Sequence, residues 1–167
     1  MPTPITPSQL DADCLRIVEH VEAYAPSLGA AIRVLYTIGC REGEIMVRSR
    51  WSRVDPATYT LLPQKGNNLR VVPSADLPLS YQHWINSSTW PGSITSVNNL
   101  RRITRAFSAL PPLFCGSKGI SSHRFRHNRI KQLYLQGQSV DQIKDYMGLL
   151  SASIVQGYVD SVITASV

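Results

Sequence analysis

Apolar residues recur at helical spacing over the first third of the chain. The segment SQLDADCLRIVEHVEAYA (residues 8–25) has apolar side chains on one helical face and begins with Ser8, a typical capping residue. The next segment, LGAAIRVLYTIG (28–39), is small and apolar on most sides, which predicts a helix at the centre of the core. Gly39 is expected to end this helix, and a third helix should begin within residues 41–50.

The periodicity changes after Pro56. The runs TYTLLP (58–63) and LRVVP (69–73) are short and of β type, and QKGNN (64–68) between them supplies turn residues. These runs predict a β-hairpin with Lys65 at its tip.

The rest of the chain returns to helical patterns. Gly137 and Gly148 are placed to end two of these helices, and Ser139 with Gln142 forms a capping box. We expect a mainly α fold of the α+β class, with a small antiparallel hairpin or sheet inserted among the helices, and a single domain over residues 1–167. The helices of this part are expected within residues 77–88, 96–110, 123–137, 139–148 and 151–163.

Composition narrows the class of protein. Apolar residues make up 43% and charged residues 17% of the 167 positions, which is typical of a globular domain. No apolar run is long enough to span a bilayer, and the first residues lack the pattern of a secretory signal. The three scattered cysteines (Cys14, Cys40 and Cys115) indicate reduced thiols and a cytoplasmic location.

The net charge of +6 favours an anionic partner, most often nucleic acid. Basic side chains in two predicted helices suit contacts to a phosphate backbone, which position a duplex without reading its sequence. These candidates for DNA binding are Arg101, Arg102, Arg105, Arg124, Arg129 and Lys131.

A few polar residues are candidates for chemistry. Arg41 follows the predicted end of a helix, with Glu44 three residues later. The pair is either a local surface contact or an arrangement in which Glu44 holds Arg41 for bidentate contact with a phosphate. Lys65 is either solvated in its turn or able to reach into a groove and deliver a proton, which arginine cannot do.

His123, Arg126 and His127 share one face of a predicted helix. The two histidines have the spacing of a zinc pair, but no third ligand lies near in the sequence, so no metal site is expected. A titratable histidine beside an arginine also suits phosphate chemistry. Tyr158, in MGLLSASIVQGYVD (147–160), is either a packing residue or a nucleophile, and its own surroundings leave both readings open.

Taken in order, these stretches resemble the catalytic domain of the tyrosine recombinase (phage integrase) family. GCREGEI resembles the first arginine box, and QKGNNLRVVP resembles the lysine hairpin. HRFRH resembles the His-x-x-Arg-His box, and MGLLSASIVQGY resembles the terminal segment that ends in the tyrosine. Each match is short, and their shared order over nearly the whole chain makes the resemblance specific.

The resemblance implies a DNA-cleaving and rejoining enzyme that needs no metal and no ATP. Tyr158 would attack the scissile phosphate and form a 3′-phosphotyrosine, and Arg41 and Arg126 would bind its non-bridging oxygens. Lys65 would protonate the leaving 5′ oxygen, and His123 would assist proton transfer from Tyr158. Glu44 would orient the site. The expected partners are double-stranded DNA and further copies of the chain, as a tetramer on DNA.

Two departures from the family pattern affect this expectation. Leu149 occupies the position where the family usually has His or Trp, and leucine can pack there but cannot hydrogen-bond a phosphate. One lost hydrogen bond to a charged group would reduce the rate by about one to two decades. Members of the family normally carry an amino-terminal helical domain that completes a clamp around DNA, whereas these 167 residues begin at the catalytic domain. We therefore expect either a fragment of a longer protein or a stand-alone catalytic domain with reduced grip on DNA.

Two alternatives stay open beside a site-specific recombinase. One is a recombinase-like module that binds DNA with weak or no cleavage. The other is a relaxing enzyme of the type IB topoisomerase kind, which shares the arginine, lysine, histidine and tyrosine chemistry.

Overall fold

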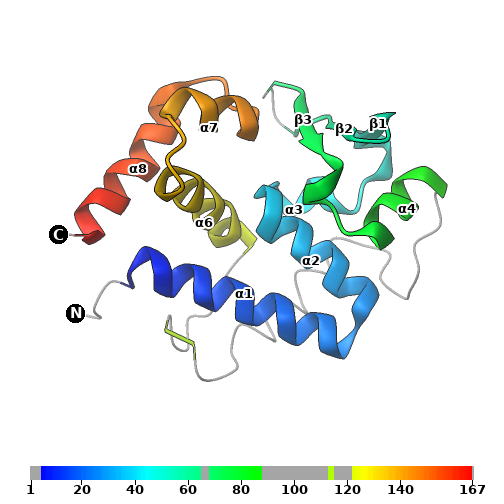
Figure 1. The fold of residues 1–167 in the computed structure, drawn as a ribbon, viewed down its shortest axis with the longest axis horizontal. Coiled ribbons are helices and arrows are strands. Elements are labelled where there is room, and N and C mark those ends of the chain that lie inside the picture. Colours follow the sequence, from blue (N-terminus) through cyan, green and yellow to red (C-terminus); the bar gives the residue numbers. More distant parts are fainter. Residues whose placement is uncertain (1–4, 65–67, 88–112, 115–121, 167) are drawn as a thin grey trace.

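The computed structural model describes residues 5–64, 68–87, 113–114 and 122–166. Helices dominate these residues, and one three-stranded antiparallel sheet is inserted among them (Figure 1). The expected mainly α fold of the α+β class is therefore confirmed. The helix expected within residues 96–110 and the tip of the hairpin at Lys65 lie outside the described residues, as does Cys115.

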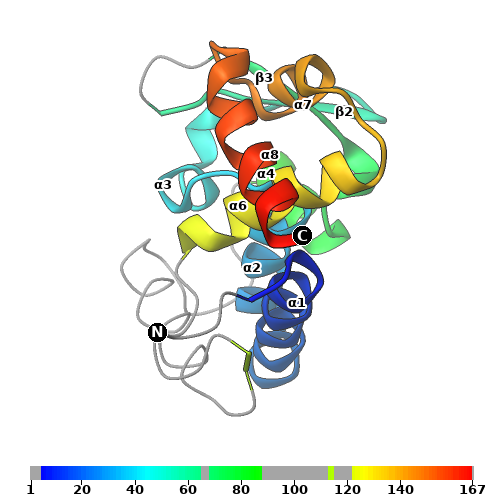
Figure 2. The ribbon, with the colours of Figure 1, turned by 90° about the vertical axis from the view of Figure 1, so that its left-hand side faces the viewer.

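Two packed helices open the fold. Helix α1 spans Pro7–Tyr24 and α2 spans Pro26–Ile38, and the two lie side by side in both ribbon views (Figures 1 and 2). The predicted cap at Ser8 is wrong. Thr6 caps α1 instead: its hydroxyl accepts from the backbone amide of Gln9, and Pro7 fits the first turn, where no amide proton is needed. Gly39 ends α2 with φ 63°, as expected.

The sheet follows two short helical turns. Helix α3 covers only Glu42–Ile45, and a 3₁₀ turn covers Arg48–Arg50. Strands β1 (Trp51–Asp55), β2 (Thr58–Leu61) and β3 (Arg70–Pro73) pair in the order β1-β2-β3. The hairpin is confirmed as the β2–β3 pair, and β1 extends it to a sheet. A second 3₁₀ turn (Ser74–Asp76) and helix α4 (Leu79–Ser87) complete this part.

Three helices form the carboxy-terminal part: α6 (Ser122–Leu135), α7 (Val140–Met147) and α8 (Ala152–Ser166). The capping box of Ser139 and Gln142 at the start of α7 is confirmed by both of its hydrogen bonds. Gly137 and Gly148 have φ 96° and 69°, the left-handed conformation that ends helices α6 and α7.

Helix α6 belongs to two hydrophobic clusters. Phe125, near its start, packs with the core formed by α1, α2, the sheet and α4. Ile130 and Leu133, further along, pack with residues of α7 and α8. Figure 2 shows α8 beside α6, with α7 above α6. Helix α6 therefore packs both against the core that contains α2, which leads to Arg41, and against α8, which carries Tyr158.

Two cysteine thiols lie in the core of the described part of the chain. Cys14 and Cys40 are buried, and burial raises the pKa of Cys40 to about 12, so its thiol stays protonated. Within the described ranges, no helix combines the length and the hydropathy needed to cross a membrane.

Candidate functional site

The turn after α2 places the first arginine. Gly39 adopts the left-handed conformation that turns the chain, and Arg41 then stands directly before α3. A Cβ at position 39 would lie 2.9 Å from the Cβ of Arg129, so close packing also favours glycine there. The Nε of Arg41 is buried and has no hydrogen-bond partner among the described groups, which leaves this guanidinium with an unused donor.

Glu44 ties this turn to the hairpin, in a way that differs from the predicted Arg41–Glu44 contact. Its carboxylate accepts from the backbone amide of Arg41 at 2.7 Å and from the backbone amide of Gln64 at 2.9 Å. No bond to the Arg41 guanidinium is recorded. The side chain is only 2% exposed, so it serves as a buried bridge between two backbone segments. Glu44 therefore holds the backbone of Gln64, the residue before Lys65, close to the backbone of Arg41.

Helix α6 supplies the second arginine. Arg126 is 4% exposed, and its Nη1 donates to the carbonyl oxygen of Gly39 at 3.1 Å. Burial lowers the pKa of Arg126, and the charges of Arg70 and Arg41 lower it further. The charges of Arg41 and Arg70 therefore both act on Arg126, and the repulsion between Arg41 and Arg126 favours binding of an anion beside these two side chains.

His123 and His127 lie on the same side of α6. Burial lowers the pKa of His123, and the neighbouring charges of Arg126 and Arg41 add to the effect. This places His123 in the same cluster as the two arginines. Burial, His123 and three basic neighbours lower the pKa of His127 to about 4, so the imidazole is neutral at pH 7.

Tyr158 faces α6 from α8. Its ring meets the ring of His127 edge to face, with centroids 4.4 Å apart, and His127 meets His123 in the same manner at 4.6 Å. Tyr158 also acts electrostatically on Arg126. The structure thus brings Arg41, His123, Arg126 and Tyr158 together from three separate segments of the chain.

An open pocket of about 540 Å³ lies beside Tyr158. Lys131, one of the predicted phosphate contacts, shares this pocket with the tyrosine. A pocket that joins a basic side chain, a neutral imidazole and a phenol suits an anionic substrate. Its lining consists of His127, Lys131, Ser153, Ile154, Gly157 and Tyr158.

The other predicted DNA contacts are distributed differently. Arg124 is partly exposed on α6 and lowers the pKa of His127 and of Lys131. Arg129 points to another side of α6: its guanidinium lies over the ring of Tyr146, 5.4 Å from the centroid. The structure therefore separates Arg129 from the pocket at Tyr158. Arg101, Arg102, Arg105 and Lys65 lie outside the described residues.

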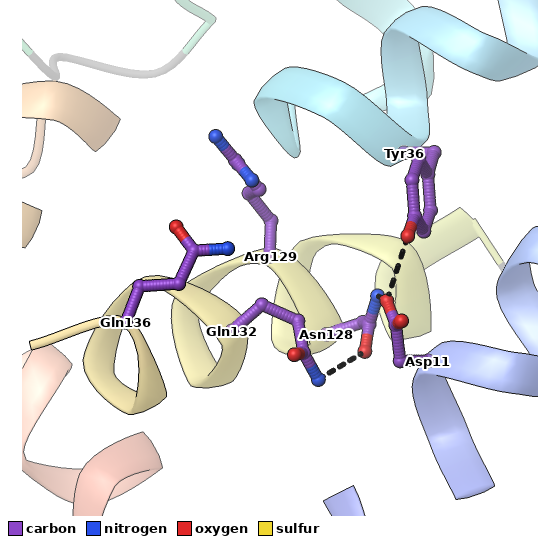
Figure 3. Close-up of a pocket in the computed structure, with 6 residues that line it drawn as sticks. All are labelled: Asp11, Tyr36, Asn128, Arg129, Gln132 and Gln136. Carbon is purple, nitrogen blue, oxygen red and sulfur yellow. Dashed lines mark hydrogen bonds between the residues drawn. The ribbon is translucent and has the colours of Figure 1, made fainter. Parts of the chain in front are cut away.

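Arg129 instead lines a small polar cavity of about 70 Å³ between α1, α2 and α6 (Figure 3). There Asp11 accepts from the hydroxyl of Tyr36 and from the amide of Asn128, both at 2.9 Å. Burial and this contact with Asp11 raise the pKa of Tyr36 to about 12. The network pairs partly buried polar groups at a helix junction, which is a structural role.

Leu149 is 3% exposed and belongs to the apolar cluster of α6, α7 and α8. It packs beneath the segment that leads to Tyr158, as expected of leucine at that position. In the described part of the chain no group of three or more His, Cys, Asp or Glu side chains could hold a metal ion.

Sequence reasoning missed two residues of the site. It did not assign His127 to Tyr158, although its position one helical turn after His123 was a usable signal. It also missed Arg70, which is 1% exposed. Arg70 shares the buried face of β3 with Val72, so the two-residue period of the strand was the available signal.

The fold of the chain is similar to that of solved recombinase structures. No protein-family model matches the sequence, and no curated protein matches it. Solved structures do match. XerA recombinase superposes with a TM-score of 0.67 at 17% identity, over 99% of this chain and 64% of that protein.

XerH site-specific recombinase matches in two states. In its post-cleavage complex with a palindromic difH substrate the TM-score is 0.62 at 15% identity, over 98% of this chain and 51% of XerH. In its pre-cleavage complex with difH the TM-score is 0.60 at 15% identity, over 95% and 50%. The chain spans about half to just under two thirds of the length of these proteins. It therefore has the fold of tyrosine recombinase catalytic domains.

Proposed function

We propose that the protein is a site-specific DNA recombinase that cleaves and rejoins DNA through a 3′-phosphotyrosine on Tyr158. The observation that carries the proposal is the convergence of Arg41, His123 and Arg126 on one cluster that faces Tyr158. The fold supports it, and so do the family motifs in the sequence.

The proposed reaction is a phosphoryl transfer in two reversible steps. The Oη of Tyr158 attacks the scissile phosphorus, a bond to the 3′-phosphate forms, and the bond to the 5′ oxygen breaks. Arg41 and Arg126 bind the non-bridging oxygens, where negative charge grows in the transition state. Rejoining reverses the step when a 5′ hydroxyl attacks the phosphotyrosine. Because the phosphotyrosine keeps the energy of the broken bond, no ATP is needed.

Proton transfers in this proposal use His123 and Lys65. A phenol with an ordinary pKa of about 10 is a weak nucleophile at pH 7 unless a neighbouring group accepts its proton. Burial and the two arginines lower the pKa of His123, so its imidazole is neutral and available as that acceptor. Lys65 donates a proton to the departing 5′ oxygen, and Glu44 anchors the chain on both sides of the site.

DNA contacts and assembly follow from the same proposal. Arg124 and Lys131 lie on the side of α6 that carries the histidines, and they would bind phosphates that flank the cleavage point. Arg101, Arg102 and Arg105, which lie outside the described residues, complete the proposed set of DNA contacts. Arg129 is left out of the set, because its guanidinium lies over the ring of Tyr146. Recombination of two duplexes requires four copies of the chain on DNA. We place the reaction in the cytoplasm, on the chromosome or on a mobile element.

Covalent trapping tests the proposal. The target sequence is first selected from a random duplex library by binding to the protein. A substrate nicked next to the cleavage position then loses its short 5′ product and traps the adduct. We expect a covalent protein–DNA species that resists denaturation, is absent in Tyr158→Phe, and forms without metal ions. Wild-type protein that binds its selected site and forms no adduct contradicts the proposal.

A DNA-binding module without efficient cleavage is the second candidate. Leu149 favours it, because this side chain is buried among apolar residues and offers no donor to a phosphate. The same assay separates the two functions: a binding module gives equal affinity and no adduct in both wild type and Tyr158→Phe.

A further inference from the structure

Arg70 is a charged residue in the protein core. It lies on β3 with its side chain on the buried face of the sheet, and only 1% of the residue is exposed. Burial lowers the pKa of its guanidinium, and no carboxylate forms an ion pair with it among the described residues. A buried charge without such a partner is unfavourable for stability alone, so its role depends on the groups that it binds.

The guanidinium of Arg70 binds the ends of two helices. Its Nη2 donates to the carbonyl oxygen of Ile38 at 2.8 Å, and its Nε donates to that of Tyr146 at 2.9 Å. Ile38 is the last residue of α2, and Tyr146 lies in the last turn of α7. Carbonyl groups at helix ends lack partners within the helix and carry partial negative charge, which suits a cation. The ring of Tyr146 lies 5.3 Å from the guanidinium carbon, and the Sδ of Met147 is 3.9 Å from Nη2.

Each segment that Arg70 joins leads to a residue of the proposed site. Ile38 precedes the turn to Arg41, and Tyr146 precedes the turn to Leu149 and α8, which carries Tyr158. Strand β3 itself is the arm of the hairpin that follows Lys65. A second bond joins this arm to the α7–α8 turn, since the amide of Asn68 donates to the carbonyl oxygen of Gly148 at 2.9 Å.

Arg70 and Arg126 also hold neighbouring carbonyls of one turn. Arg126 binds Gly39, and Arg70 binds Ile38, the residue before it. The charge of Arg70 acts on Arg126. The Nη1 of Arg70 is buried and has no hydrogen-bond partner within the described ranges. The other nitrogens of this guanidinium contact two carbonyl oxygens and the Met147 sulfur, and the group as a whole lies over the Tyr146 ring.

We propose that Arg70 is a positioning residue for strand transfer, which holds the turn to Arg41, the hairpin arm after Lys65 and the turn before Tyr158 as one unit. The proposal rests on the proposed function and assigns Arg70 no contact with DNA. A planar guanidinium can bind two carbonyls in different directions, whereas the ammonium of lysine on its shorter reach cannot hold both. Loss of the unit would misplace reacting groups while leaving the DNA-binding surface intact.

The test compares Arg70→Lys and Arg70→Met with wild type on the nicked substrate. The measurements are the single-turnover rate of adduct formation at saturating DNA, the affinity for uncleaved DNA, and the folded fraction by circular dichroism at the assay temperature. We expect Arg70→Lys to lose about 10- to 100-fold in rate per folded molecule and Arg70→Met to lose more, with affinity within about threefold. Arg33→Lys is the matched control, because Arg33 binds Glu22 through two bonds of 2.6 Å away from the site.

A glycine pair gives an independent test if Arg70→Met does not fold. A Cβ at Gly148 would lie 2.5 Å from the Cγ of Arg70 and 2.8 Å from the backbone oxygen of Asn68. Gly148→Ala therefore displaces the arginine and the hairpin arm that carries it, without removing the guanidinium. Gly137→Ala imposes a similar backbone strain at φ 96° with no atom within 4 Å of the new methyl group. We expect the rate per folded molecule to fall in Gly148→Ala and to stay within about twofold of wild type in Gly137→Ala.

The outcomes separate this proposal from the function on which it rests. If wild type forms no adduct, the proposed function fails and the role of Arg70 fails with it. If wild type forms the adduct and Arg70→Lys retains the full rate per folded molecule, only the role of Arg70 is overturned. A purely structural arginine gives that second result, because it lowers the melting temperature and leaves the rate of the folded fraction unchanged.

Discussion

Removal of the charge on Glu44 is expected to weaken both folding and catalysis. In Glu44→Gln the side chain keeps its shape, but only its amide oxygen can accept a hydrogen bond. The carboxylate now accepts from the amides of Arg41 at 2.7 Å and of Gln64 at 2.9 Å. In the variant one of these amides faces an NH₂ group, which has no lone pair to offer.

The magnitude follows from the two contacts. Hydrogen bonds to a charged group contribute about 1.5–3 kcal/mol each, and a buried donor left without a partner costs about 1–3 kcal/mol. With Glu44 at 2% exposure, water does not replace the lost acceptor. We therefore expect the free energy of unfolding to fall by about 2–4 kcal/mol.

The rate of adduct formation should fall by more than the loss of folded protein explains. Glu44 fixes the backbone at Arg41 and the start of the turn to Lys65, and a small displacement of reacting groups lowers a rate by about 100-fold. The net charge of the variant is one unit more positive, so affinity for DNA should hold or increase. A lower rate with undiminished binding is thus the expected signature.

The assay is urea unfolding followed by adduct formation on the nicked substrate at saturating DNA. Glu19→Gln is the control, because it makes the same charge change at an exposed position on α1. A loss of less than about 0.5 kcal/mol in Glu44→Gln, together with an unchanged rate, would refute the bridging role.

Three further predictions concern stability. The pKa of His127 is lowered to about 4, so the unfolded chain binds a proton at this residue more readily than the folded protein does. The stability of wild type relative to His127→Phe should therefore be fully present above about pH 6.5 and should decline by about 1–2 kcal/mol as the pH falls from there through 4, a modest loss because the imidazole is partly exposed. Unfolding curves of both proteins across this pH range check the prediction. Leu149→Ala should lower the free energy of unfolding by about 2–4 kcal/mol, whereas the same change at Leu150, which is 58% exposed, should lower it by less than about 0.5 kcal/mol. Gly39→Ala should lower it by about 1–2 kcal/mol, because φ is 63° there and the new methyl group approaches Arg129; a melting temperature equal to that of wild type would contradict this account.

Local signals in the sequence determined the secondary structure and the candidate chemistry. Gly39, Gly137 and Gly148 end helices because glycine adopts the left-handed conformation without a steric penalty. The capping box of Ser139 and Gln142 and the β2–β3 hairpin are likewise determined by residues that are close in the sequence. The cap of α1 was misplaced by two residues, because Thr6 and Ser8 are both good caps and the choice depended on Pro7 and Gln9.

Tertiary structure decided how the site is held together. Glu44 binds backbone amides 3 and 20 residues away, and Arg70 binds carbonyls 32 and 76 residues away. Such partners are backbone groups, which every residue carries, so no residue type in the sequence marks them. The sequence by itself determined which side chains were available for phosphate chemistry. Folding decided which buried groups hold them together, because burial removes the water that would otherwise satisfy each charge.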